Sequence, residues 1–488
     1  MNPQIQNHES MLKESIKHFL TSHYRGSSDY TSFETIFFRL IQTMLDPPLE
    51  VTWFYSAVTF HAAKTRPQSN NPSTRVVIAK DLLNLLISCS NLSSASKKIA
   101  LLAPVVYELC NLVCDSRTVK MEVDRLVEDM VSHIMMSAAV YDHGNRDVKC
   151  DNDVVCFEDL VRVWTTDRGG GSCNFAENLR VFFPLLTDGI LKEVSGRFGV
   201  RELVGIVLCE VFFLRLYLSF GSGMCMEEFL KVTQDQTIQT MKGFLNSYFI
   251  DMLLKMLLEP SLPVSSLLSS KDAVILYKAL YDAVVLIDYS FCSGRWAQSN
   301  DGHFKRLALL WVLVAERAIQ FARAKSDQDR AILYLSAFRE SRLMAELIKW
   351  ASTQAGVMDQ NGRPDLTTPN ALIQWLFALE DQGIRIFDHN VSLLYAKAIS
   401  TLGSQSPELG LQRANGDLEM GDPLDKRYPH AFGLMSTENG LGRKRKESDS
   451  GLQELRVAQV RRVSDNETHL GVQVISVSSN DDADNMES

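Results

Sequence analysis

Residues Leu203–Phe220 read LVGIVLCEVFFLRLYLSF, the most apolar long window of the chain. Two charged side chains, Glu210 and Arg215, stand within it. A membrane-spanning helix needs about 20 predominantly apolar residues, and charges near its centre are costly. A helix buried in a protein interior can place such charges at a seam between helices. The window therefore predicts a buried core helix in a helical protein, with no membrane association.

Helix-start signals recur on both sides of this window. A side chain that caps the first free N–H groups is followed by a proline, or by an acid three residues later. The signals are Thr31 with Glu34, Asn71-Pro72, Ser269 with Asp272, Ser326 with Asp329, and Thr368-Pro369. Alternating runs of strand type are nearly absent before residue 403. The chain therefore has the pattern of an all-α protein.

The apolar residues between these starts follow a helical period. Ile332, Leu343, Leu347 and Trp350 fall near multiples of 3.6 residues, which predicts one shared face. Some segments are apolar around more than half of their circumference, so we expect them to be covered on more than one side. They are Val76–Ser90, Leu101–Cys114 and Leu307–Ala318.

Successive helix starts lie roughly 20 to 25 residues apart, a spacing typical of antiparallel helical hairpins. The starts are near Thr31, Val51, Ser73, Ser96 and Lys120. Stacked hairpins of this kind resemble an α-solenoid of the HEAT or armadillo type. No repeat consensus aligns one block with the next, so an irregular helical bundle is the alternative.

Composition divides the chain into three regions. Pro260 and Pro263 mark a break between an N-terminal helical region, 1–259, and a C-terminal helical region, 264–402. Polar insertions interrupt the first region at 142–153 and 165–174, and helical order is expected to end near Leu402. Residues 403–488 lack Cys and Trp and have few aromatics, which predicts a disordered regulatory tail.

Charge and cysteine usage narrow the class of protein. The net charge is −9, and the tail holds ten basic and fifteen acidic residues, which leaves about −4 for residues 1–402. A body of this charge is a poor general ligand for a phosphate backbone. Nine dispersed cysteines argue against a disulfide framework, and Met1–Leu20 lacks a hydrophobic signal core. These features indicate a soluble protein in a reducing compartment.

The residues before the tail carry no recognisable catalytic or metal-binding motif. The glycines from Gly169 lack the Lys-Ser/Thr of a phosphate loop, and Asp151–Asp153 lacks the glycine of a calcium loop. Cys110 and Cys114 share a helix face but have no second pair of zinc ligands, which favours core cysteines. His18, His23, His61 and His133 have no partner in sequence that indicates a triad. We expect no enzyme activity, no catalytic residue, no cofactor and no metal.

A basic cluster in the tail predicts nuclear import. Arg443, Lys444, Arg445 and Lys446 are consecutive and follow Gly442. The cluster resembles the monopartite import signal that importin-α binds, in which consecutive cations of an extended peptide meet acidic pockets. The alternative is that the cluster has no function and is only a run of solvated charges. We expect a nuclear or nucleocytoplasmic protein.

A short apolar run near the end of the tail predicts docking to a modifier protein. Val474, Ile475 and Val477 flank one serine, and Asp481 and Asp482 follow. The run resembles a SUMO-interacting motif, which adds a strand to the edge of the modifier's sheet. The adjacent acids can steer the encounter with a basic rim. A patch without function, or a strand that docks on the body, is the alternative.

Serines of the tail are candidate phosphorylation sites. Ser464 follows Arg461-Arg462, a pattern that basophilic kinases accept, while Ser448 and Ser478 lie close to acids. Phosphate near the apolar run would add negative charge and strengthen modifier binding.

Together these features predict a nuclear, non-enzymatic helical scaffold or adaptor subunit that mediates protein–protein interactions in a multiprotein complex. Helical arrays with SUMO-linked tails resemble accessory subunits of chromosome-maintenance and DNA repair assemblies. One alternative is a nucleic-acid-associated transcription or repair regulator with a basic groove. Another is a cytosolic trafficking or ubiquitin-ligase adaptor. An enzyme would require dispersed His, Asp and Cys residues to meet in one pocket.

Overall fold

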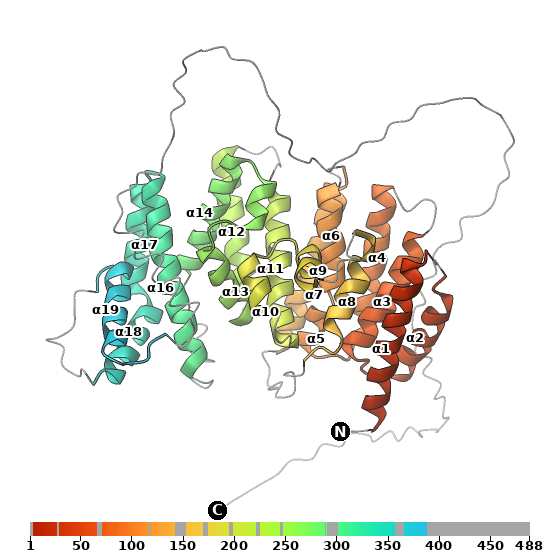
Figure 1. The fold of residues 1–488 in the computed structure, drawn as a ribbon. Helices are drawn as coiled ribbons and strands as arrows, with labels where there is room; N and C mark the ends of the chain where they lie inside the picture. Colours follow the sequence, from red (N-terminus) through yellow and green to blue (C-terminus); the bar gives the residue numbers. More distant parts are fainter. Residues whose placement is uncertain are drawn as a thin grey trace, which may run out of the picture. The chain divides into compact units, whose positions relative to one another are not determined.

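The computed structural model describes residues 3–26, 29–65, 71–115, 118–141, 153–168, 174–194, 199–220, 225–244, 247–287, 289, 301–356 and 366–387. Contacts divide the chain into Met1–Arg445 and Lys446–Ser488, and every described residue lies in the first unit. The described residues form helices and one isolated bridge, Asp153 to Gly199, with no strand among them (Figure 1). The predicted all-α class is confirmed.

The first helices pack largely in chain order. They are α1 (Pro3–Tyr24), α2 (Thr31–Thr43), α3 (Leu49–Lys64), α4 (Pro72–Cys89), α5 (Ala95–Ala100), α6 (Ala103–Asp115) and α7 (Lys120–Tyr141). α2 packs on α3, α3 on α4, α4 on α6, and α6 on α7. The predicted starts of α2, α3, α4, α5 and α7 are within two residues of the observed ones. α6 matches the apolar helical segment predicted over Leu101–Cys114, although its start was not among the predicted helix starts.

Three short helices and a 3₁₀ turn return to the earlier helices. They are α8 (Phe157–Thr165), η1 (Thr166–Arg168), α9 (Phe175–Phe182) and α10 (Asp188–Val194). α8 packs on both α1 and α3, and α9 packs on α8. This return contact is absent from a simple solenoid, in which each unit touches only its neighbours. The described helices therefore form an irregular array.

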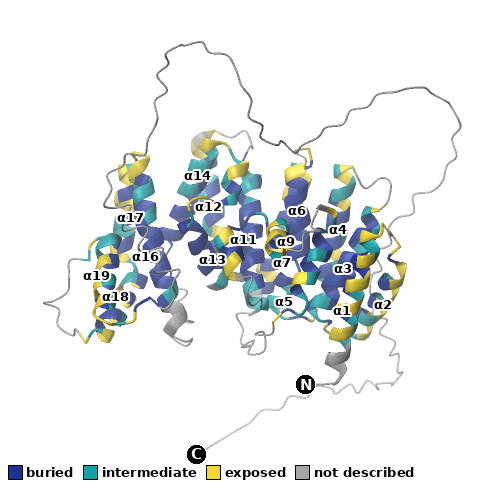
Figure 2. Cartoon of the chain, viewed as in Figure 1, coloured by how far each residue is buried: buried dark blue, intermediate teal, exposed yellow. Residues whose placement is uncertain are grey.

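The remaining helices are built around two buried ones. The elements are α11 (Val200–Ser219), α12 (Met226–Phe244), α13 (Ser247–Leu258), η2 (Pro263–Leu267), α14 (Ser270–Val285), α16 (Asp301–Ala324), α17 (Gln328–Glu340), α18 (Arg342–Gln354) and α19 (Pro369–Asp381). α11 contacts α5, α6, α7, α12 and α13, and α16 contacts α13, α14, α17, α18 and α19. Every residue from Leu203 to Leu214 is buried (Figure 2). The predicted core helix is confirmed, and none of the described helices is long and apolar enough to span a membrane.

The proline break does interrupt the helices, because α13 ends at Leu258 and η2 begins at Pro263. Packing nevertheless crosses it: α12 contacts α14, and α13 contacts α16. The division into 1–259 and 264–402 stays a prediction. The helix expected near Leu402 and the tail 403–488 lie outside the described residues.

The helix caps test the local predictions directly. Asn71, Ser269 and Thr368 each cap their helices, accepting hydrogen bonds from the N–H groups of Ser73, Asp272 and Ala371. The other two predictions were wrong by position. Asp29, not Thr31, provides the oxygen at the start of α2, because Thr31 is itself the first helical residue. Asp327, not Ser326, caps α17.

The predicted face shared by Ile332, Leu343, Leu347 and Trp350 was wrong. The helix is interrupted at Ser341, where the backbone is extended, so Ile332 belongs to α17 and the other three to α18. Leu343 and Leu347 are buried, whereas Ile332 is exposed. Of the three segments predicted to be covered on more than one side, those in α6 and α16 are confirmed by their burial, whereas the one in α4 is not, because Val77 is 54% exposed.

Candidate functional site

The described residues bring together His23, His61 and Asp167, which the sequence left unconnected. His61 lies in the last turn of α3, and Asp167 lies in η1, which follows α8 directly. The His61 Nε2 atom is 2.8 Å from the Val163 carbonyl oxygen, and its Nδ1 atom is 3.4 Å from Asp167 Oδ2. The His61 side chain is 2% exposed. α8 and η1 are thus joined to α3 through one buried imidazole.

Both nitrogens of the His61 ring face oxygen atoms that can only accept a hydrogen bond. A neutral imidazole has one donor and one acceptor nitrogen, and only the imidazolium has two donors. The carbonyl of Val163 and the carboxylate of Asp167 are therefore both satisfied when His61 is protonated. The ion pair with Asp167 offsets part of the cost of burying that charge.

The Asp167 carboxylate is the centre of this cluster. Its Oδ2 atom is also 3.3 Å from Lys64 Nζ, one turn beyond His61 on α3. Burial acts to raise the pKa of Asp167, but the hydrogen bond and charge of His61 and the charge of Lys64 outweigh it, so the pKa lies well below its usual range. Asp167 is therefore ionised at all but strongly acidic pH.

His23 brings α1 to the same cluster. Its Nδ1 atom is 3.0 Å from the Tyr30 hydroxyl oxygen, and its Nε2 atom is 3.8 Å from Asp167 Oδ1. Burial and the adjacent His61 charge lower the pKa of His23, and Asp167 opposes them only partly. The lowered pKa favours the neutral form of His23.

The charges continue from this cluster across two more helices. Lys64 Nζ lies 3.9 Å from Oε2 of Glu108 on α6, and Arg75 of α4 binds Glu108 Oε1 at 2.9 Å. Arg75 also binds Asp115 at 2.7 Å. Opposite charges thus alternate from η1 through α3 and α6 to α4. Both His61 nitrogens are engaged by protein acceptors, so the geometry suits helix attachment better than proton transfer to a substrate.

Glu210 and Arg215, considered together from the sequence, make separate contacts. Glu210 Oε1 accepts a 2.9 Å hydrogen bond from the Leu185 N–H, and burial raises the pKa of Glu210 to about 8. Arg215 binds Glu128 of α7 at 2.6 Å and Thr240 of α12 at 2.6 Å. Each side chain stands at a contact between helices, as expected for a charge in a buried core helix.

The two cysteines of α6 differ. Cys110 is buried, and its thiol lies 3.7 Å from Glu210 Oε2 as a weak donor. Burial and the carboxyl of Glu210 raise the pKa of Cys110 well above its usual value. Cys114 is exposed, so the interpretation as a core cysteine holds only for Cys110. No group of three or more His, Cys, Asp or Glu side chains within the described ranges could hold a metal ion.

A second polar cluster lies between α14 and α17. Asp282 is buried, and its two carboxylate oxygens accept hydrogen bonds from Tyr334, at 2.6 Å, and from Arg330. Asp327, which caps α17, pairs with Lys278 of α14 at 2.8 Å. No motif in the sequence pointed to these residues. The available signal in the sequence was the spacing of Arg330 and Tyr334, which lie one helical turn apart and both bind Asp282 in the structure.

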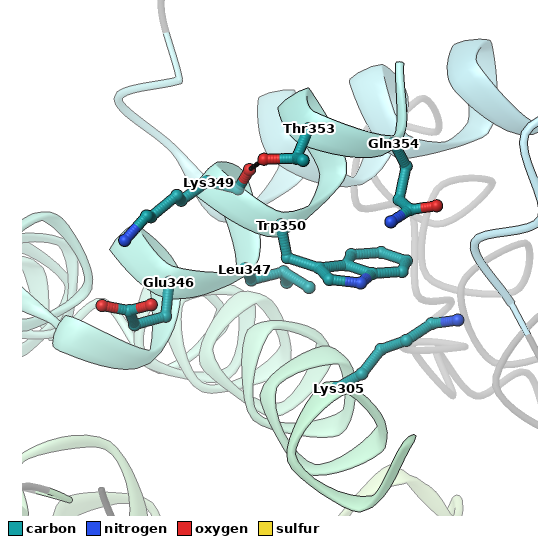
Figure 3. A pocket seen from close by; sticks show the side chains of 7 residues that line it. All are labelled: Lys305, Glu346, Leu347, Lys349, Trp350, Thr353 and Gln354. Carbon is teal, nitrogen blue, oxygen red and sulfur yellow. Dashed lines mark hydrogen bonds between the residues drawn. The ribbon is translucent and has the colours of Figure 1, made fainter. Parts of the chain in front are cut away.

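A surface hollow of about 240 Å³ lies between α16 and α18 (Figure 3). Lys305 and Trp350 contribute its charge and its aromatic face, with the Lys305 ammonium 4.4 Å from the centre of the Trp350 ring. The hollow is lined by Lys305, Glu346, Leu347, Lys349, Trp350, Thr353 and Gln354. Lys305 and Lys349 against Glu346 leave the lining with a single excess positive charge, which by itself selects no ligand class.

The tail sites predicted from the sequence lie outside the described residues. They are the import cluster Arg443, Lys444, Arg445 and Lys446, the docking residues Val474, Ile475, Val477, Asp481 and Asp482, and the serines Ser448, Ser464 and Ser478. The glycine run from Gly169 lies outside them as well. These assignments stay predictions.

Comparison of the chain with models of protein families, with curated proteins and with solved structures found no match. The function has to be argued from the residues alone.

Proposed function

We propose that the chain is a nuclear, non-enzymatic helical scaffold that holds protein partners in a multiprotein complex. The observation that carries the proposal is the use of buried ionisable side chains to join helices. Asp282 joins α14 to α17, Glu210 joins α11 to the backbone before α10, and His61 joins α3 to α8 and η1. Buried polar groups used in this way favour one arrangement of the helices, as a binding platform requires.

The exposed large apolar side chains of this array include pairs on α7 and on α17. Met121 and Met136 of α7 are 79% and 64% exposed, and Ile332 and Leu333 of α17 are 62% and 50% exposed. Methionine adapts its shape readily and is common at protein-binding surfaces. These positions supply substitutions for separating partner binding from folding.

The tail predictions supply the cellular part of the proposal. The Arg443–Lys446 cluster would take the protein to the nucleus through importin-α, and Val474–Val477 with its acids would dock SUMO or SUMO-modified proteins. Such a tail suits an accessory subunit in chromosome maintenance or DNA repair. With a net charge near −4 ahead of the tail, protein surfaces are better partners for the body than nucleic acid.

Affinity purification of the intact protein from nuclear extract, followed by quantitative mass spectrometry and reconstitution, tests the scaffold. We expect partners in stoichiometric amounts that also bind a chain truncated after residue 402. The double variant Ile332→Glu/Leu333→Glu tests whether the exposed face of α17 binds a partner. Val77→Glu, at an exposed apolar position of α4, is the control. A chain that is monomeric in nuclear extract and reconstitutes with none of the recovered proteins contradicts the proposal.

The modifier part has its own experiment. A peptide spanning Gly471–Asp484 is titrated with SUMO, and a peptide with Val474, Ile475 and Val477 changed to Ala is the control. We expect saturable binding that the control peptide lacks, because strand addition needs the apolar side chains in their pockets. If both peptides release the same heat in the titration, SUMO binding is removed from the proposal, and the proposal of a scaffold is unaffected.

A further inference from the structure

We propose that protonated His61 is a pH-dependent clamp that holds α1 and the α8–η1 segment on α3, and that deprotonation of His61 releases α1. The inference rests on geometry around one ring and is independent of the proposed scaffold function. It assigns to this end of the array a conformational change that pH controls.

The clamp depends on two donor contacts made by a buried ring. His61 donates through Nε2 to Val163 and through Nδ1 toward Asp167, and it is 2% exposed. When the ring loses its second proton, one nitrogen presents a lone pair to an oxygen that also has only lone pairs. The His61 ring is buried, so water cannot stand between the two facing atoms, and that contact becomes unfavourable.

Several charged or titratable groups surround His61. α1 supplies His23, and η1 supplies Asp167. Lys64 on α3 faces the same carboxylate and leads to Glu108 of α6, while Tyr30, before α2, binds His23. His23 and His61 are the imidazoles among these groups, and imidazole is the side chain type whose charge changes between about pH 5 and pH 8. Burial and the charge of His61 lower the pKa of His23, which favours its neutral form.

α1 depends on the clamp because it lies at an end of the described array. It packs on α8, the helix that His61 holds to α3. The Phe19 ring of α1 lies 5.6 Å from the His61 ring and 6.0 Å from the Phe54 ring. Movement of α8 and η1 away from α3 therefore removes the surface on which α1 rests. Release would expose the aromatic side chains of Phe33 and Phe54, which contact Phe19.

Hydrogen–deuterium exchange of the full-length chain tests the clamp. Protection factors, which correct for the intrinsic pH dependence of exchange, are compared at about pH 6 and about pH 8, either side of ordinary histidine titration. We expect protection of Leu12–Phe19 to fall roughly tenfold or more, the effect of losing one hydrogen bond to a charged group. Protection of α16, whose Leu307–Ala315 segment is buried, should stay constant. The proposal is overturned if the protection of α1 does not fall, or if the protection of α16 falls by the same factor.

Four variants identify the group responsible. His61→Gln keeps one donor but no charge and Asp167→Asn removes the acceptor charge, so both should show low protection of α1 at both pH values. His23→Gln should keep the wild-type response, and so should His133→Gln on α7. Loss of the response in His23→Gln assigns the titration to His23 and overturns the proposal.

A spectroscopic measurement covers the case in which a variant fails to fold. The wild-type chain is labelled with ¹⁵N in histidine side chains, and the His61 resonances are followed with pH. Two protonated ring nitrogens at about pH 6 that give way to one above about pH 8 support the clamp. A neutral ring throughout this range overturns it.

Discussion

The hydroxyl of Tyr334 donates a 2.6 Å hydrogen bond to Asp282 Oδ1, joining α17 to α14 across 52 residues of sequence. Arg330, one turn earlier on α17, binds the other oxygen of the same carboxylate. Burial and the charge of Asp282 raise the pKa of Tyr334, so the hydroxyl keeps its proton and remains a donor. Asp282 is itself buried, and one of its two oxygens depends on Tyr334.

Tyr334→Phe should therefore destabilise the protein by about 1 to 3 kcal/mol, because it leaves a buried carboxylate oxygen without its donor. The ring is kept, so packing changes little. Urea unfolding followed by circular dichroism measures the free energy of unfolding. Tyr24→Phe, at an exposed tyrosine of α1, is the matched control and should be neutral. Equal stability of both variants would show that the Tyr334 bond contributes nothing net.

Glu210→Gln should change how stability depends on pH. Burial raises the pKa of Glu210 from 4.5 to about 8 in the folded chain, so the folded state holds the proton more tightly than the unfolded state. Its contribution is fully present below about pH 4.5 and is lost as the pH rises through about 8. At about 1.4 kcal/mol per pKa unit, the loss is on the order of 5 kcal/mol.

Glutamine cannot ionise, and its carbonyl oxygen can still accept from Leu185. The Glu210→Gln variant should therefore lose less stability than the wild type between about pH 6 and pH 9. Urea unfolding midpoints across this range provide the measurement. Glu227→Gln, near the start of α12 and exposed, should follow the wild-type slope. Parallel slopes for Glu210→Gln and wild type would show that Glu210 does not titrate in this window.

Asp167→Asn should show the opposite dependence at acid pH. Although burial opposes it, the pairing with His61 and Lys64 lowers the pKa of Asp167, so its contribution is present above the unfolded pKa of about 3.9 and is lost as the pH falls below it. The wild type should therefore lose more stability than Asp167→Asn as the pH falls toward the folded pKa of Asp167. Thermal unfolding at a series of acid pH values measures the difference. Asp235→Asn, exposed on α12, should keep the wild-type slope, and an equal slope for Asp167→Asn contradicts the prediction.

Local features of this fold were predictable because their causes are local. The apolar window at Leu203–Phe220 is a buried helix, since burial requires only that its neighbours cover an apolar surface. The caps Asn71 and Thr368 were predictable because each satisfies N–H groups within three residues. The cap at Ser326 was displaced by one residue, to Asp327, whose carboxylate also pairs with Lys278 of another helix. That competing contact cannot be seen from the sequence near residue 326.

The His61 cluster could not be predicted for the same reason. His61 and Val163 are 102 residues apart, and no periodic pattern relates them. Asp167 belongs to a polar insertion that has the composition of a loop, and only the return of α8 onto α3 brings it to His61. Pairing of distant charges depends on tertiary packing, so histidines without sequence partners stayed unassigned.

The import cluster predicts a change in location. Changing Arg443, Lys444, Arg445 and Lys446 to Ala removes the cations that acidic pockets on importin-α would bind. We expect the full-length variant to lose nuclear accumulation, measured by fluorescence microscopy of a tagged chain. Changing Lys426 and Arg427 to Ala is the control and should leave location unaltered. Retention in the nucleus after loss of all four cations contradicts the predicted signal.

Two glycines on neighbouring helices should respond oppositely to alanine. A Cβ at Gly205 of α11 would lie 3.0 Å from Cβ and 3.1 Å from the carbonyl carbon of Tyr248, on the helix α13 that packs against it. The backbone at Tyr248 cannot move away unless α13 moves as a whole. The resulting strain should therefore outweigh the gain of about 1 kcal/mol that alanine brings to a helix. At Gly243 of α12 the first obstacle is the terminal methyl of Met135, a partly exposed side chain that can rotate away. Gly205→Ala should lower the free energy of unfolding and Gly243→Ala should raise it, as urea unfolding would measure. If Gly205→Ala proves the more stable of the two, α11 and α13 are packed less closely than described here.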